Sequence, residues 1–158
     1  MGIIVFLHHR RPVAITCVMP ETLLAQLTPK ATHIGQAEIL AAMMLPLYCP
    51  AEIRDQAIIH FVDNQSAIAG LVKCYSTKED SSSLLGLYAV LMTALQATSW
   101  IEFVESEANA SDGISRDGIF DLLVTKLNCE VSEKVFPDIH NLHTAPLEAL
   151  ISVFSNTP

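Results

Sequence analysis

Three acidic side chains stand where a carboxylate could do chemistry. Glu38 is the lone charge in a long apolar segment rich in Ala, Leu and Met. Asp63 directly follows the apolar run Ile58–Val62, and Asp112 comes shortly after the alternating run Trp100–Glu105. Carboxylate oxygens are the ligands that hard divalent cations prefer, and such cations can activate water. We therefore treat these three acids as candidate metal ligands.

Each acid also has a purely structural interpretation, and the sequence leaves both open. Glu38 could lie on the exposed face of a helix, since acidic residues are seldom buried. Asp63 could be the N-cap of a helix that begins near Ser66, because Asp and Asn favour that position. Asp112 could be a cap or a first-turn acid, stabilised by the helix dipole.

The elements that must position these acids follow from hydrophobic patterning and from helix and turn signals. We predict strands at Gly2–His9, Val13–Met19, Ile58–Val62 and Trp100–Glu105. We predict helices at Ile34–Leu45, which Pro46 should end, and at Ser66–Tyr75, Leu84–Thr98 and Asp112–Leu127. A strand hairpin that leads into alternating helices and strands indicates an α/β fold, with a mixed sheet and helices on its faces. The same order lets the three acids converge at one edge of that sheet.

At this point the sequence resembles a known family. The segment His60–Ala67 (HFVDNQSA) resembles the strand-end DNxxA segment of ribonuclease H domains in retrotransposon and pararetrovirus reverse transcriptase polyproteins. Asn109–Arg116 (NASDGISR) is similar to the closing NxxDxxSR motif of these domains, and Gln36–Glu38 (QAE) resembles the helix segment that supplies their glutamate. The resemblance extends over about Gly2 to Asp117. The two aspartate motifs together are moderately specific, whereas either one alone is not.

The resemblance implies metal-dependent hydrolysis of the RNA strand of an RNA–DNA hybrid. Glu38, Asp63 and Asp112 would be the catalytic residues and the ligands of two Mg²⁺ ions, with Mn²⁺ as a substitute. Asn64 and Ser66 would shape the strand-end turn, and these two residues with Arg116 would contact the substrate. Ser115 would brace the last helix together with Arg116. The implied partners are the hybrid itself and the polymerase domain of the same polyprotein.

One departure from the family pattern affects both the chemistry and the fold. The family's first aspartate lies on a strand that precedes the part matched by Gly2–His9, and no Asp or Glu occurs here before Glu21. We therefore expect a ribonuclease H-like fold that is truncated at its N-terminus, with impaired hydrolysis. Backbone groups beside the missing strand would lose their partners, and exposed sheet edges invite self-association. Two alternatives stay open: a non-catalytic ribonuclease H-like scaffold or interaction module, and an unrelated small α/β domain whose acids are only caps.

Composition limits the remaining possibilities. The 158 residues suffice for one core, and we divide them into a ribonuclease H-like domain at 1–127 and a tail at 128–158 with a short helix at Leu147–Phe154. The net charge of −8 argues against tight, independent binding of nucleic acid. The uncharged stretch Ser81–Ile101 is long enough to span a bilayer, but its polar ends favour a buried helix that runs into a strand. With neither a secretory signal nor a membrane span predicted, and with four cysteines spaced as free buried thiols, we expect an intracellular location, in the cytoplasm or the nucleus.

Overall fold

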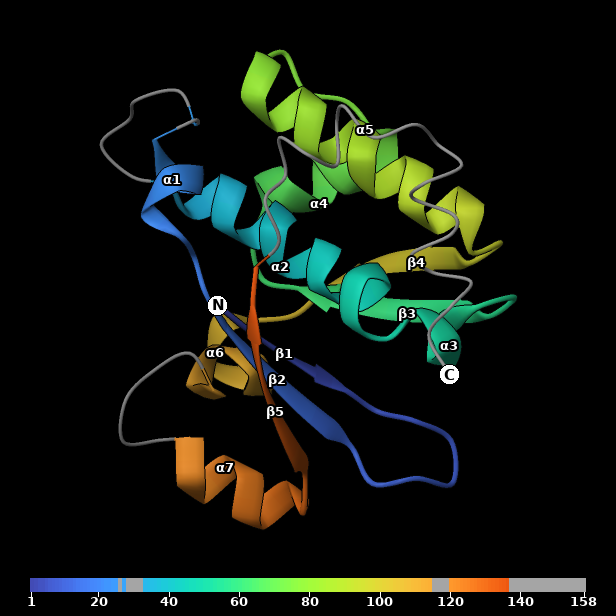
Figure 1. Ribbon diagram of the computed structural model, residues 1–158, viewed down its shortest axis with the longest axis vertical. Helices are drawn as coiled ribbons and strands as arrows, with labels where there is room; N and C mark the ends of the chain where they lie inside the picture. Colours follow the sequence, from blue (N-terminus) through green and yellow to red (C-terminus); the bar gives the residue numbers. More distant parts are fainter. Residues whose placement is uncertain (26, 28–32, 115–119, 137–158) are drawn as a thin grey trace.

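The computed structural model (Figure 1) describes the chain except for residues 26, 28–32, 115–119 and 137–158. The strands in the described part are β1 (Gly2–Val5), β2 (Val13–Val18), β3 (Ala57–Val62), β4 (Thr98–Phe103) and β5 (Glu130–Val135). The helices there are α1 (Glu21–Leu24), α2 (Ile34–Tyr48), α3 (Pro50–Ile53), α4 (Gln65–Lys73), α5 (Glu79–Ala94), α6 (Ala110–Ile114) and α7 (Phe120–Leu127), with a 3₁₀ turn at Ser106–Ala108. The chain is thus a mixed α/β protein, as the sequence predicts.

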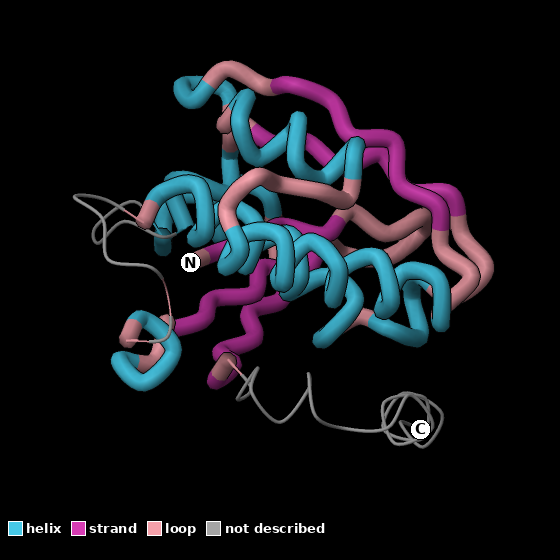
Figure 2. The backbone as a smooth tube through the Cα atoms, turned by 90° about the horizontal axis from the view of Figure 1, so that it is seen from above, coloured by secondary structure: helices cyan, strands magenta, loops and turns pink. Residues whose placement is uncertain are grey.

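The described strands form two sheets, where the sequence predicts a single mixed sheet. In the first sheet β2 lies between β1, which runs antiparallel to it, and β5, which runs parallel. The second sheet is the parallel pair β3–β4, in register from Ala57 opposite Thr98 to Val62 opposite Phe103. Figure 2 shows the strands in two corresponding groups. No described strand pairs with the outer edge of β1 or with the outer edge of β3, which is why the sheet is divided.

One apolar core joins the two sheets, with α2 at its centre. Helix α2 packs against α5, α4 and β1, and Leu40, Met43 and Met44 on it are fully buried. Side chains alternate along β2, so Ile15 and Cys17 face this core while Ala14 faces the opposite side. Residues of both sheets therefore contribute to one hydrophobic core.

A second, smaller cluster covers the opposite face of the first sheet. Ile114 of α6 packs there with Ala14 and Cys129, and Val124 and Leu127 of α7 pack against them. The first sheet consequently has helices on both of its faces. The outer face of the β3–β4 pair differs, because Ile59, Phe61 and Trp100 on it stay largely exposed.

Three local predictions need correction. Pro46 does not end its helix: α2 continues to Tyr48, and the Cys49 N–H still donates to the Leu45 carbonyl at 3.0 Å. A proline this close to the C-terminus of a helix disturbs only its last turns, and the apolar ring of Pro46 is buried. Strand β5 was not predicted; it lies in the segment assigned to a tail, and its alternation is weak because most of its side chains are exposed. Cys74 is an exposed thiol, while the other three cysteines are free and buried.

The stretch considered as a membrane span forms α5 and then β4, as the polar ends of the stretch indicate. None of the helices in the described part of the chain combines the length and the apolar character that crossing a bilayer requires. The predicted short helix at Leu147–Phe154 lies outside the described residues.

Candidate functional site

Glu38 is half-buried on α2, and its surroundings tie it to the two candidate aspartates. Its pKa is raised above the ordinary value of 4.5, first by burial and then by the negative charges of Asp63 and Asp112. The positively charged amino group of Met1 acts in the opposite direction. Glu38, Asp63 and Asp112, which we call the carboxylate cluster, therefore lie within electrostatic range of Glu38 although they are far apart in the sequence. Glu38 therefore does not lie on an exposed face of its helix.

Asp63 lies just past the end of β3, and it is not the cap of the helix that follows. The N-cap is Asn64, whose Oδ1 accepts the Ala67 N–H at 3.0 Å and the Ser66 hydroxyl at 2.7 Å. Because Asn64 supplies this cap, the Asp63 carboxylate is not needed to begin α4. Asn64 and Ser66 thus shape the strand-end turn through their own hydrogen bonds.

Asp112 is brought to the cluster by the short helix α6. Asn109 precedes this helix, and its Oδ1 accepts the Ser111 N–H at 3.2 Å and the Ser111 hydroxyl at 2.6 Å. Helix α6 packs closely on β1: a Cβ added at Gly2 would lie 3.1 Å from the Ile114 side chain. Since Asn109 occupies the turn, the interpretation of Asp112 as the capping side chain does not fit, although Asp112 does lie in the first turn.

The carboxylate cluster has the kind of ligand atoms that a hard divalent cation prefers, but the arrangement of its three side chains fits such a cation less well. Three carboxylates offer the oxygen ligands that Mg²⁺ selects, and Mg²⁺ commonly keeps several water ligands and uses only one or two carboxylates. Within the ranges that the structure describes, however, no group of three or more His, Cys, Asp or Glu side chains is arranged to hold a metal ion. The cluster is therefore an electrostatic grouping of acids and not a closed metal cage. Strand β1, with the sequence GIIV, adds no carboxylate to it.

The residues expected to contact substrate divide into two groups. Asn64 and Ser66 lie beside Asp63, and their side chains are engaged in the α4 cap. Arg116 and the neighbouring Ser115 lie outside the described residues.

A pocket that was not predicted has Ser66 of the α4 cap in its lining. It has a volume of about 500 Å³ and lies between the start of α2, α4 and the loop before α5. Lys73, Lys78 and several hydroxyl groups line it, and none of the described acidic side chains is part of its lining. Gly35 and the Ser66 hydroxyl close one end, with 3.8 Å between that oxygen and a Cβ added at Gly35. Lys73 is the last residue of α4, and Lys78 is the residue that precedes α5 as its N-cap.

His60 is a second feature that sequence reasoning missed. It lies on β3, and burial lowers its pKa from 6.5 to about 4. Its Nδ1 is buried and has no hydrogen-bond partner. A histidine inside an otherwise apolar strand is the signal that could have drawn attention to it.

Comparison of the chain with protein-family models, with curated proteins and with solved structures finds no match.

Proposed function

We propose that the chain is a ribonuclease H-like domain that acts on the RNA strand of RNA–DNA hybrids with the help of divalent cations. The observation that carries this proposal is the convergence of Glu38, Asp63 and Asp112 from α2, from the end of β3 and from α6. These are the three acids that the sequence motifs single out. Helix capping does not account for the positions of Asp63 and Asp112, because Asn64 and Asn109 accept the backbone N–H groups at the starts of the two helices.

In this proposal the acids and the lysines have different roles. The carboxylate cluster would hold Mg²⁺ or Mn²⁺, which when bound supplies an activated water and stabilises the leaving oxygen. Binding of a cation would also lower the mutual repulsion that raises the pKa of Glu38. Lys73 and Lys78, in the pocket that Ser66 also lines, would neutralise phosphates of the hybrid.

We expect the proposed hydrolysis to be slower than that of ribonuclease H domains with a full set of carboxylates. The related domains use four carboxylates, while the cluster has three and β1 contributes none. The overall charge of −8 opposes the approach of a polyanion, so affinity for the hybrid would depend on a partner. The polymerase domain of a reverse transcriptase polyprotein, in the cytoplasm or nucleus, is the partner that fits this proposal.

A second candidate function is a non-catalytic module of the same fold that docks other proteins. The outer face of the β3–β4 pair favours it, because Ile59, Phe61 and Trp100 are 66%, 58% and 69% exposed. A contiguous exposed apolar patch often marks an interaction surface.

An RNA-cleavage assay separates the two candidates. The full chain is incubated with a hybrid whose RNA strand carries a fluorescent end label, in Mg²⁺ or in Mn²⁺, and with single-stranded RNA as the control substrate. We expect slow, cation-dependent cleavage of the hybrid alone, lowered at least about 100-fold by Asp63→Asn, since a lost metal ligand is not replaced by an amide. The control variant Asp121→Asn changes an exposed acid on α7 and should retain full activity. Equal cleavage by the Asp63→Asn variant would refute the nuclease role, and a complete lack of cleavage by every form would favour the docking module.

A further inference from the structure

Strand β4 has a free edge whose backbone groups have no partner strand in the described part of the chain. The Thr98 N–H donates to the Gln56 carbonyl at 2.9 Å, and the Val104 N–H donates to the Val62 carbonyl at 3.1 Å. Backbone groups alternate in direction along a strand, so the even-numbered residues of β4 face β3. The N–H and C=O groups of Ser99 and Ile101 consequently point to the open edge of the sheet.

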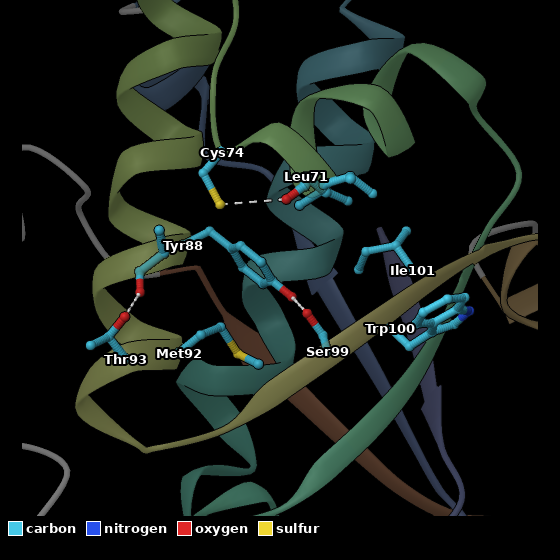
Figure 3. A pocket seen from close by; sticks show the side chains of 10 residues that line it. Leu71, Cys74, Tyr88, Met92, Thr93, Ser99, Trp100 and Ile101 are labelled. Carbon is cyan, nitrogen blue, oxygen red and sulfur yellow. Dashed lines mark hydrogen bonds between the residues drawn. The ribbon is translucent and has the colours of Figure 1, made fainter.

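A groove runs beside this free edge, as Figure 3 shows. Its volume is about 450 Å³, and β4, α5 and the end of α4 form its walls. Most of its lining is apolar, including Leu71, Ala89, Met92 and Ile101. These residues surround enough space for one large side chain. None of the three acids of the carboxylate cluster lines this groove, so it is a separate feature of the molecule.

One polar pair stands in the apolar lining. The Tyr88 hydroxyl and the Ser99 hydroxyl are 3.0 Å apart and share one hydrogen bond, in which either can be the donor (Figure 3), and Tyr88 itself is buried. Because these two hydroxyl groups are already hydrogen-bonded to each other, an apolar side chain fits the groove best. The unpaired donors and acceptors are those of the β4 backbone, and they match the main chain of an extended peptide.

Charge around the groove selects among such peptides. The carboxyl end of β4 is acidic, with exposed side chains at Glu102, Glu105 and Glu107. The Glu102 carboxylate accepts the indole N–H of Trp100 at 2.8 Å, which holds it beside the strand. Among the residues that the structure describes, no lysine or arginine lines the groove. A basic segment therefore complements this end of the edge.

From these observations we propose that the β4 edge is a docking site for an extended peptide of a partner protein. The peptide adds to the β3–β4 sheet as a third strand, hydrogen-bonds to the backbone of Ser99 and Ile101, and inserts one apolar side chain between α5 and β4. Basic residues at one of its ends lie against Glu102 and Glu105. The site is independent of the carboxylate cluster, and it does not require the nuclease function.

Binding can be measured with a defined peptide and the only tryptophan of the chain. The probe is the acetylated and amidated peptide KTVFVTKK, and Trp100 beside the groove reports its arrival through intrinsic fluorescence. We expect saturable binding with a dissociation constant below about 1 mM. Amide exchange at Ser99 and Ile101 should slow in the complex. The peptide KTVPVTKK, in which proline removes the central N–H and the large side chain, should bind at least about tenfold more weakly.

Two variants of the protein test the two parts of the proposed site, which are the backbone edge of β4 and the apolar groove. Ile101→Pro removes a backbone N–H from the free edge while leaving the β3 pairing of the even-numbered residues, and it should weaken binding at least about tenfold. Ala89→Lys places a long cationic side chain in the groove and should do the same. The matched control is Val90→Lys, which adds the same charge to the next position of α5, outside the groove lining, and should bind like the wild type. If Ile101→Pro does not fold by circular dichroism, Ala89→Lys against Val90→Lys decides.

Several outcomes would overturn the proposal. One is an absence of saturable peptide binding to the wild-type chain. Another is equal affinity of the Ala89→Lys and Val90→Lys variants for the peptide. A third is a Trp100 response to single-stranded nucleic acid but not to the peptide, which would assign the face to a different class of partner.

Discussion

At the scale of single residues, the negative charges of Asp63 and Asp112 act on Glu38 although the three acids are far apart in the sequence. The position of Asp63 after an apolar run and that of Asp112 within NASDGISR follow from the sequence, and both acids influence the pKa of Glu38. The sequence could not say which polar residue caps each turn, because Asp and Asn suit that role equally. The sequence shows a histidine inside an apolar strand, but it does not show that the Nδ1 of His60 is buried without a hydrogen-bond partner.

His60 should make the fold sensitive to acid. Its folded pKa of about 4 lies below the ordinary value of 6.5, so the unfolded chain takes up its proton first as the pH falls. The fold is therefore not penalised above pH 6.5, and it loses up to about 1.4 kcal/mol per pH unit from this group between pH 6.5 and 4.

Urea unfolding at several pH values checks this effect. The wild-type free energy of unfolding should fall between pH 6.5 and 4, and His60→Gln should flatten that fall. The exposed His8 supplies the matched control as His8→Gln, which should keep the wild-type pH dependence. An identical slope in the wild type and the His60→Gln variant would contradict burial of a neutral imidazole.

At the scale of elements, the sequence predicted the order of the main helices and strands but not all of their limits. Apolar periodicity located β3 and α4 to within about two residues, and the run into β4 was recognised from its polar ends. The extension of α2 past Pro46 depends on tertiary burial of the proline ring, which local rules do not contain. Strand β5 is mostly exposed and owes its conformation to pairing with β2, so its own pattern is weak.

Two glycines test the contact between α4 and α5. A Cβ added at Gly70 would lie 3.0 Å from a methyl group of Leu85, which is fully buried. Gly70→Ala should therefore cost about 1–3 kcal/mol of stability through overpacking. Gly86→Ala should instead stabilise by about 0.5–1 kcal/mol, because Gly86 lies within α5 and a Cβ there meets nothing within 4 Å.

Thermal or urea unfolding measures the change in the free energy of unfolding of each glycine variant. Opposite signs of the two changes would support the close approach of the helices. Stabilisation of both variants would mean that α4 and α5 lie farther apart than described.

At the scale of the whole molecule, the division into two sheets is the property least accessible to sequence reasoning. Strands β1 to β4 could each be recognised from their own patterns, but which edges remain unpaired depends on all strands together, including β5. In the described part of the chain the outer edges of β1 and β3 are open, and Ile59 and Phe61 beside the β3 edge are exposed. Open edges next to apolar side chains promote association.

We therefore expect the purified chain to self-associate as its concentration rises. Phe61→Lys places a charge beside the β3 edge and should shift the distribution toward the monomer. Val90→Lys, at an exposed valine on helix α5 and not on a strand, is the matched control and should associate like the wild type. Sedimentation velocity over a 100-fold range of concentration measures the effect. A wild-type chain that stays monomeric over that range would refute association through the sheet edges.

The measurement closest to the central claim is a calorimetric titration of the full chain with Mn²⁺, which tests whether Glu38, Asp63 and Asp112 act together. We expect saturable binding that weakens at least about tenfold in each of Glu38→Gln, Asp63→Asn and Asp112→Asn, because each variant removes a charged oxygen ligand from the same cluster. The Asp121→Asn control should bind like the wild type. Equal Mn²⁺ affinity in the wild type and all three cluster variants would show that these acids do not form one cation site, and the proposed nuclease function would fail with it.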